Sequence, residues 1–527
     1  LTVSFPVIAS NPSWAQKARI YFLFPKAAST AGTINAAAGR LQNIKDLGFN
    51  VIWMMPVMKN ALPIDQNYGP GYNIVDFSNV APEYGTNQDF KNFVSQAHAL
   101  GLKVILDVTP NHSSRLHPWS IDAHTFKTNS VYWNWYEHST ITANPNGLGD
   151  CLDADQFNYY CGFSDQLMNF NWSDVDMRTA MIDVYKYWIT QMGVDGYRLD
   201  VYWGPHRRYG EAFMGKPVRD ALKHIKPDIL LLGEDDGTGS GTEAIYADHV
   251  TGGINGGVDA AYDFKLYFNQ IRNFNFASPG IAALNNEIDN GGFYPGVNAL
   301  YMRFMESQDE DRIVYFYSNN FVIDTLTTFK RTMPMASVLF TAPGLPMIWN
   351  GQEVGWGYGI PGAKEARNRS TINWNYQGKS ILSAHYQKLA HIRGQFPAFT
   401  QHKRDTNHDA GVTSADSADF ISVPTGNGVV YAFARPYPDQ NGLTVVNFSA
   451  ITQSVRLDLT IANDLQLSGG IQPLGSYFLN DLYNNTHRQL YGSQLDSVMI
   501  DLPAFGSAIY TISMTADSVI ITNPVLA

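Results

Sequence analysis

Short, continuous apolar runs recur along residues 1–400 of the chain. Eight of them show no alternation of apolar and polar positions, which is typical of strands buried on both faces. The runs are ARIYFLF (18–24), NVIWMMP (50–56), KVILDV (103–108), GYRLDV (196–201), DILLLG (228–233), VDAAYDF (258–264), ALYMRFM (299–305) and LPMIW (345–349). The sequence therefore predicts eight buried strands.

Helical patterns lie between these runs. Residues 86–100 begin with Thr86 and Asp89, a capping pair, and continue with apolar residues on one face. Residues 177–192 carry an apolar stripe at helical spacing, and Gly193 ends the pattern. Strands that alternate with helices predict a fold of the α/β class, a closed (β/α)8 TIM barrel.

Two segments depart from this alternation. The interval between the third and fourth strands is too long for one helix, and residues 111–175 are rich in Asn, Asp, Ser and aromatics. We interpret it as a small inserted domain after strand 3. Beyond residue 400 the runs VVYAFAR, LTVVNFS, VRLDL and SAIYTIS indicate a C-terminal all-β sandwich. The expected domains are a barrel of residues 1–110 and 176–400, an insertion of residues 111–175 and a tail of residues 401–527.

Composition narrows the class of protein. Hydrophobic residues make up 45% of the chain and charged residues 16%, as in a globular protein with a sizeable core. The formal net charge is -11 and no basic patch stands out, so we expect no nucleic-acid partner. No apolar run reaches the length of a membrane span. The high aromatic content, 13%, suits stacking against flat ligands such as sugar rings.

The two cysteines, Cys151 and Cys161, stand close together in CLDADQFNYYC. They are either two free thiols or one local disulfide that clamps a loop, and we favour the disulfide. A disulfide indicates an oxidising compartment. The chain also begins at Leu1 rather than Met, which suggests a processed or trimmed form. We therefore expect a secreted or periplasmic protein.

Polar residues gather where the predicted strands end. In a (β/α)8 barrel the carboxyl ends of all the strands meet at one rim, where active sites lie. A single strand-end acid often only caps the next helix, but acids from several strands on one rim indicate a site. The strand-end residues are Asp107, Asn111, His112, Arg198, Asp200, Glu234 and Asp309.

The stretches around these residues carry a resemblance to a known family. DVTPNH (107–112), GVDGYRLDV (193–201), LLGED (231–235) and MESQDEDR (305–312) resemble, in order, the four signature regions of the α-amylase family of glycoside hydrolases. GYNIVDFSNVAPEYGT (71–86) and GLPMIWNGQE (344–353) are similar to its regions after the second strand and at the eighth. The β-rich tail resembles the C-terminal domain of the family. The resemblance implies a carbohydrate-cleaving barrel enzyme.

The resemblance assigns three catalytic acids. Asp200 would be the nucleophile, Glu234 the general acid and base, and Asp309 the third acid, which holds the substrate and stabilises the transition state. Cleavage with retention needs one ionised and one protonated carboxyl, about 5 to 5.5 Å apart. Arg198 shares a strand face with Asp200 and is expected to keep it ionised.

Further substrate contacts follow from the resemblance. Tyr72 would stack on the sugar ring and His112 would donate to a hydroxyl. Gln308 and Trp203 stand where the family more often has His and Lys, and we expect an amide donor and an aromatic platform there. Glu306 matches an acid often present in the motif, whereas Glu310 and Asp311 are expected to be solvated loop charges.

A structural calcium ion is the only cofactor that the resemblance suggests. Its candidate ligands are Asn111, Asn169 and Gly204, with Asn169 in LMNFNW (167–172) where the family more often has Asp. A neutral amide is a weaker calcium ligand than a carboxylate. The alternative is that Asn111 and Asn169 only bridge the insertion to the barrel by hydrogen bonds.

The leading prediction is a monomeric, retaining hydrolase of α-1,4 bonds in an α-glucan substrate such as starch or malto-oligosaccharides. Three alternatives stay open. One is a transglycosylase, in which a sugar hydroxyl competes with water. Another is an α-1,6 or sucrose-type glucosidase. The last is a non-catalytic glycan-binding relative, which would typically lack one of the acids.

Overall fold

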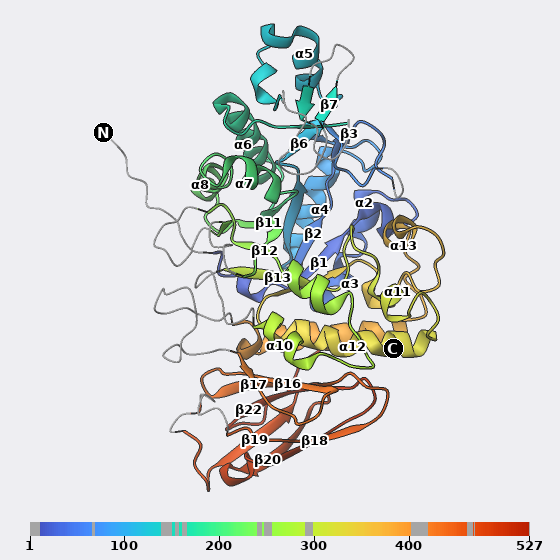
Figure 1. Cartoon of the computed structure of the whole chain (residues 1–527), viewed down its shortest axis with the longest axis vertical. Helices are drawn as coiled ribbons and strands as arrows, with labels where there is room; N and C mark the ends of the chain where they lie inside the picture. Colours follow the sequence, from blue (N-terminus) through green and yellow to red (C-terminus); the bar gives the residue numbers. More distant parts are fainter. Residues whose placement is uncertain are drawn as a thin grey trace, which may run out of the picture.

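The structure is a computed structural model of the chain. It describes residues 11–65, 69–138, 150–152, 158–160, 166–239, 245–246, 256–289, 299–401, 420–460, 467 and 470–525. Figure 1 shows three layers along the long axis, with the inserted segment at one end, a barrel in the middle and an antiparallel sheet at the other end.

The middle layer is a closed barrel of eight parallel strands. Its order is β1-β14-β13-β12-β11-β10-β5-β2, so each strand pairs with its neighbours among the eight predicted runs. All eight predicted strands are confirmed. Their bounds are β1 (Ile20–Leu23), β2 (Val51–Met54), β5 (Lys103–Val108), β10 (Gly196–Leu199), β11 (Leu230–Asp236), β12 (Ala260–Tyr262), β13 (Leu300–Phe304) and β14 (Leu345–Trp349).

Helices surround the barrel, and two of them match the predicted patterns. In α4 the side chains and backbones of Thr86 and Asp89 form the expected capping box, and α6 ends before Gly193, which has a φ of +84°. The bounds are α1 (Pro25–Ala28), α2 (Ile34–Ala38), α3 (Leu41–Asp46), α4 (Asn87–Ala99), α6 (Val175–Thr190), α7 (Trp203–Tyr209), α8 (Gly215–Ile225), α9 (Phe264–Leu266), α10 (Ile281–Ile288), α11 (Ile313–Tyr317), α12 (Thr325–Thr341), α13 (Lys364–Arg369) and α14 (Ala384–Gln395).

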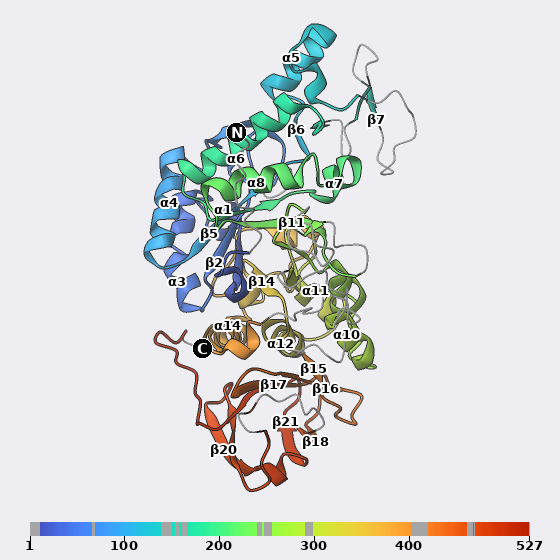
Figure 2. The same ribbon diagram turned by 90° about the vertical axis from the view of Figure 1, so that its left-hand side faces the viewer.

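The segment between β5 and α6 leaves the barrel, as Figure 2 shows. It contains β6 (His112–Ser114), α5 (Pro118–Phe126), β7 (Asp150–Leu152), β8 (Asn158–Tyr160) and β9 (Leu167–Asn169). The β6 and β9 strands pair antiparallel and pack near β4 (Ile74–Val80), which itself pairs with β3 (Met58–Asn60). Cys161 and the side chain of Cys151 lie outside the described residues, so the disulfide stays a prediction.

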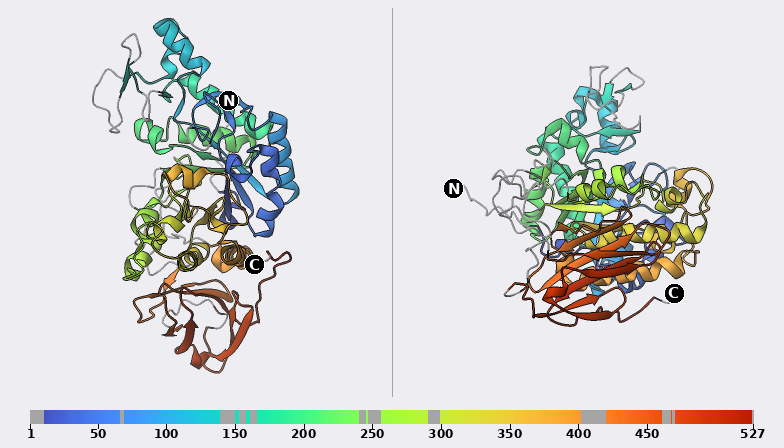
Figure 3. Two further views of the ribbon diagram at one scale, coloured as in Figure 1. Left: turned by 90° about the vertical axis from the view of Figure 1, so that its right-hand side faces the viewer. Right: turned by 60° about the horizontal axis from the view of Figure 1, so that its bottom comes forward.

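The C-terminal layer consists of antiparallel strands, as predicted. A six-stranded sheet of order β15-β16-β17-β22-β19-β20 faces the pair β18-β21 across a separate apolar core. The bounds are β15 (Ile421–Ser422), β16 (Val430–Arg435), β17 (Gln440–Asn447), β18 (Gln453–Leu457), β19 (Ser476–Asp481), β20 (Thr486–Tyr491), β21 (Val498–Leu502) and β22 (Ser507–Ser513). Helix α12 lies between the barrel and this sheet (Figure 3), and Ser337 in α12 hydrogen-bonds Ser507 in β22. The expected domain boundaries stay predictions.

Aromatic rings fill the barrel interior below the carboxyl-end rim. The rings of Phe22 and Trp53 are stacked with centroids 3.5 Å apart, and Trp349 packs edge-on against Phe22. The indole N–H of Trp53 points to the rim, where it donates to Asp107 at 3.1 Å. The core therefore forms the apolar floor of the site described next.

Candidate active site

The strand-end polar residues do meet at one rim. Arg198 in β10 is in register with Asp107 in β5 and with Leu232 in β11. Asp200 follows β10 directly, and Glu234 lies within β11. Because parallel strands of a barrel end at the same rim, these side chains come together from three adjacent strands.

Arg198 is the centre of this cluster and is completely buried. Its Nη1 atom lies 3.0 Å from Asp107 and 2.6 Å from Asp200, and its Nη2 atom lies 2.5 Å from Glu234. Its Nε–H donates to the hydroxyl of Tyr262 at 3.0 Å. One guanidinium thus holds three carboxyl groups, and the two predicted to do the chemistry lie on its two adjacent nitrogen atoms.

The backbone directly after Asp200 also hydrogen-bonds Glu234. The N–H of Val201 donates to Oε2 of Glu234 at 2.6 Å. Val201 has a φ of +49°, a left-handed conformation that is unusual for a β-branched residue. This strained turn aims the N–H at the carboxyl group.

Burial sets the protonation of the two carboxyl groups. It raises the pKa of Glu234 to about 8, because Arg198 only partly offsets the desolvation and the nearby charges of Asp200 and Asp309 add to it. Burial also raises the pKa of Asp200, to about 7, against the attraction of Arg198. The raised pKa of Glu234 suits a general acid, which must hold a proton at working pH.

Asp107 forms the floor of the cluster. From the sequence it is only one of several strand-end polar residues. In the structure it is fully buried, pairs with Arg198 and accepts from Trp53 and from the Tyr72 hydroxyl at 2.9 Å. Burial raises its pKa to about 7, although Arg198 counteracts this. It orients both Arg198 and Tyr72.

Asp309 lies on the loop after β13, which one strand, β12, separates from β11 in the barrel. Its side chain is 53% exposed, the most open of the three predicted acids. Arg369 lies 3.3 Å from Oδ1, and the Gln308 amide donates to Oδ2 at 2.9 Å. Lys364 donates to the backbone carbonyl of Asp309 at 2.5 Å. Asp309 is thus accessible to solvent, while Arg369, Gln308 and Lys364 fix its position.

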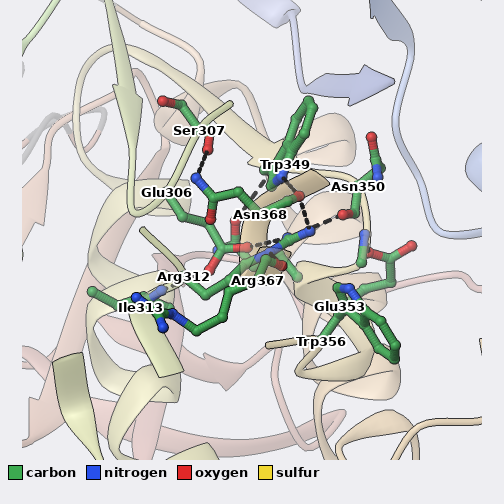
Figure 4. A network of polar contacts seen from close by, with 12 residues as sticks. Glu306, Ser307, Arg312, Ile313, Trp349, Asn350, Glu353, Trp356, Arg367 and Asn368 are labelled. Carbon is green, nitrogen blue, oxygen red and sulfur yellow. Dashed lines mark hydrogen bonds and ion pairs between the residues drawn. The ribbon is translucent and has the colours of Figure 1, made fainter. Parts of the chain in front are cut away.

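Helix α13 holds this loop from behind. The side-chain amide of Asn368 donates to the carbonyls of Ser307 at 3.1 Å and of Glu310 at 2.7 Å. Figure 4 shows Arg312 between Glu306, Asn350 and Asn368. Arg312 is completely buried, pairs with Glu306 at 2.7 Å and donates to both backbone carbonyls.

The expectation of solvated charges on this loop was wrong. Asp311 is 5% exposed and forms an ion pair with Arg367 of α13. Glu310 is half-buried and accepts from the Tyr267 hydroxyl at 3.1 Å. Both acids hold the loop in place because their partners lie on elements distant in the sequence.

Two of the predicted substrate contacts touch the acids directly, because Tyr72 donates to Asp107 and Gln308 donates to Asp309. Tyr72 is partly exposed, and its backbone carbonyl is 3.0 Å from Nε2 of His112. Burial lowers the pKa of His112 to about 4, so its ring is neutral. The Gln308 amide is 3.5 Å from the Tyr72 hydroxyl, which joins the third acid's loop to Tyr72. Trp203 begins α7 and is partly exposed, with the Arg207 guanidinium 4.9 Å from its ring.

The three residues suggested for calcium also meet, but a cation of the chain lies among them. The Asn111 amide donates to Asn169 at 3.0 Å, and a side chain at Gly204 would touch Asn111. The oxygen of Asn111 accepts from Arg208 at 2.7 Å. Sequence reasoning missed Arg208, and also Arg369 and Glu137, because none of them stands in a recognised motif.

A (β/α)8 barrel with paired carboxyl groups at its carboxyl-end rim has the fold and residue types of a glycoside hydrolase. Residues 22–422 match the family model described as alpha amylase, catalytic domain, and this is more than half of the chain. The chain belongs to the α-amylase family and is a glycoside hydrolase of that family.

Similar proteins agree with this assignment. Alpha-amylase MalA of Haloarcula japonica is 24% identical over 457 residues, which is 85% of this chain and 57% of that protein. The chain therefore spans little more than half of that relative. An oligo-1,6-glucosidase of Parageobacillus thermoglucosidasius is 25% identical over 456 residues, 76% of this chain and 77% of that protein.

The fold also has close counterparts among solved structures. A crystal structure of an alpha-amylase from Geobacillus thermoleovorans has a TM-score of 0.72 at 23% identity, over 94% of this chain and 98% of that one. In the part of the chain that the structure describes, no helix combines the length and apolar character needed to cross a bilayer.

Proposed function

We propose that this glycoside hydrolase cleaves α-1,4 bonds of starch or malto-oligosaccharides with retention of configuration. The observation that carries the proposal is the shared guanidinium: Asp200 and Glu234 contact adjacent nitrogen atoms of Arg198. Contact with one guanidinium keeps the two carboxyl groups near each other, which supports a double displacement.

The reaction takes two steps. The ionised Asp200 attacks the anomeric carbon while Glu234 gives its proton to the leaving glycosidic oxygen, and the C–O bond breaks. Glu234, now ionised, removes a proton from water as the water oxygen attacks the same carbon. This releases Asp200 and returns the proton to Glu234, so the enzyme is unchanged.

The remaining residues bind and orient the sugar. Asp309 would hold the hydroxyls of the ring at the cleavage site, with Gln308 beside it. Tyr72 would stack on that ring, and Trp203 would support the sugar on the leaving-group side. Because Asp309 is half-open to solvent, it is the acid best able to gain new hydrogen bonds when the sugar enters.

A second candidate reaction is cleavage of α-1,6 bonds. A relative that aligns over 76% of this chain carries the name oligo-1,6-glucosidase. Transglycosylation is the third, since the same glycosyl-enzyme would be captured by a sugar hydroxyl at the aromatic platform of Trp203.

The test is a product time course on amylose, maltoheptaose and isomaltotriose, resolved by chain length. Products that are only shorter than maltoheptaose support α-1,4 hydrolysis. Products longer than maltoheptaose overturn it in favour of transglycosylation, and turnover of isomaltotriose alone favours the α-1,6 assignment. Proton NMR of the first product reports the anomer: an α anomer supports retention and a β anomer overturns it. An Asp200→Asn variant with full activity would overturn the assigned nucleophile.

A further inference from the structure

The junction between the inserted segment and the barrel is built around Asn111. Its Nδ2 atom donates to Oδ1 of Asn169, and its backbone carbonyl accepts from Phe170 at 3.0 Å. A Cβ atom at Gly204 would lie 2.8 Å from Oδ1 of Asn111. The barrel, the inserted segment and the start of α7 therefore meet at one amide group.

The cation at this junction is Arg208. It lies four residues after Gly204 on α7, so the two share one face of the helix. Its Nη2 atom donates to Oδ1 of Asn111 at 2.7 Å, and its Nη1 atom would be 3.3 Å from a Cβ atom at Gly204. Glycine leaves room here because a side chain would crowd the Asn111 oxygen and press on the guanidinium.

The partner acid comes from the inserted segment. The Nε–H of Arg208 donates to Oε1 of Glu137 at 2.7 Å, and the hydroxyl of Tyr209 donates to the same oxygen at 2.5 Å. The side chains of Arg208 and Glu137 are only 11% and 13% exposed. The backbone N–H of Glu137 donates to the carbonyl of Asn169 at 3.0 Å, which fixes the acid beside the two amides.

These residues do not fit a calcium ion. Calcium takes six to eight oxygen ligands, usually with several negative charges. Here one amide oxygen accepts from a guanidinium, the other accepts from an amide, and the carboxylate is already neutralised by Arg208. Across the described residues no group of three acidic, histidine or cysteine side chains could hold a metal ion.

We propose that the Arg208 guanidinium takes the place of a metal ion at this junction, so that the junction requires no calcium. Arg208 carries a fixed positive charge and forked donors, so it satisfies Asn111 and Glu137 together. It joins α7, which follows the predicted nucleophile, to the inserted segment. The junction therefore carries its own positive charge on one oxygen of Glu137, while the second oxygen of Glu137 is buried without a hydrogen-bond partner among the described residues.

The first test uses the wild-type chain as purified. We expect no stoichiometric calcium by elemental analysis, and a thermal midpoint that neither excess EDTA nor millimolar calcium moves by more than about 1 °C. Bound calcium, or a midpoint that falls with EDTA and recovers with calcium, would overturn the proposal.

The second test removes the cation. An Arg208→Met variant should unfold at least about 4 °C lower. Amide hydrogens of β6 and β9 should exchange about tenfold faster, because Glu137 is left buried without its counter-charge. The matched control is Lys186→Met, which removes the cation of an exposed pair with Asp183 and should shift the midpoint by less than about 2 °C. An Arg208→Met variant with wild-type midpoint and exchange rates would refute the role.

A third variant separates charge from shape. Arg208→Lys keeps the positive charge and loses the fork, so its midpoint should lie between those of the wild type and Arg208→Met. If the thermal midpoints of Arg208→Lys and Arg208→Met fall by the same amount, the positive charge does not stabilise the junction, and the proposal fails. The chelator test and the midpoint of Arg208→Lys relative to the wild type both stand even if the Met variant does not fold.

Discussion

The backbone N–H of Val201 donates to the carboxyl group of Glu234 at 2.6 Å, so the residue after the predicted nucleophile holds the predicted acid. To point its N–H at Glu234, Val201 adopts a left-handed backbone conformation with a φ of +49°. A β-branched residue accepts such a conformation only where its surroundings enforce it. The strain and the hydrogen bond together suggest that the turn serves the reaction.

A Val201→Gly variant should separate these two contributions. Glycine relieves about 1–2 kcal/mol of left-handed strain, which offsets much of the packing lost with the valine side chain. We expect the free energy of unfolding to change by less than about 1 kcal/mol. We expect kcat to fall about tenfold, because the N–H direction is no longer fixed. Val201→Asn, which tolerates this conformation, should lose less. Urea unfolding and initial rates measure both effects, and an unchanged kcat in the glycine variant would contradict the argument.

The pH dependence of kcat/KM should follow the buried pair. Glu234 must be protonated to act as an acid, and its pKa is raised to about 8, so activity should persist to about pH 8 and fall above it. Asp200 must be ionised, and burial raises its pKa, so the acidic limb should lie above the ordinary range of an aspartate. A rate profile from pH 4 to 10 checks this. An alkaline limb near pH 5 would contradict the raised pKa of Glu234.

Stability should depend on the same group. The pKa of Glu234 rises from an ordinary 4.5 to about 8 on folding, so the native state holds this proton more tightly. The associated stability is present below about pH 4.5 and is lost as pH rises through about 8. Glu234→Gln removes that loss. Its thermal midpoint relative to the wild type should rise by at least about 2 °C between pH 5 and pH 8.5. A constant difference across this range would be inconsistent with a raised pKa.

Removing Arg198 should be far more severe than removing a surface cation. Arg198→Met leaves three buried carboxyl groups without a counter-charge, and we expect a loss of about 3–5 kcal/mol with activity reduced at least about a thousandfold. Lys216→Met, which breaks an exposed pair with Asp220, should cost less than about 1 kcal/mol. Chemical denaturation and single-substrate kinetics provide the comparison. Equal losses in the two variants would argue against a central role for Arg198.

Two residues of α13 should support the Asp309 loop in different ways, Arg369 mainly for activity and Asn368 mainly for stability. Arg369→Gln loses the contact with Asp309 but leaves the loop backbone held, so kcat/KM should fall about ten- to hundredfold with little loss of stability. Asn368→Ala leaves the carbonyls of Ser307 and Glu310 without their donor and should cost about 1–3 kcal/mol. Kinetics and denaturation of both variants test this split. The reverse pattern would show that Arg369 is the structural member.

Local patterns were sufficient for the barrel and for its principal residues. Each strand contains a short, largely apolar run, and closing such strands into a barrel brings Arg198, Asp200 and Glu234 to one rim by topology alone. The strand period also places Arg198 on the face of Asp200, and the 2.6 Å contact agrees with that prediction.

Contacts between distant segments could not be predicted in the same way. Asp311 resembles a loop charge until Arg367, 56 residues later in the sequence, comes to lie beside it. Arg208 resembles an ordinary helix residue, because its partners Asn111 and Glu137 come from other parts of the chain. Such pairings depend on how the loops pack, and periodicity carries no information about that.

The path of the chain at Asn111 has a mechanical consequence. Only Thr109, Pro110 and Asn111 separate the end of β5 from the start of β6. The inserted segment therefore begins beside His112, whose ring lies 3.0 Å from the backbone carbonyl of Tyr72. The Tyr72 hydroxyl in turn donates to Asp107, which pairs with Arg198. A shift of the inserted segment would thus reach the carboxyl groups on the barrel strands through Tyr72.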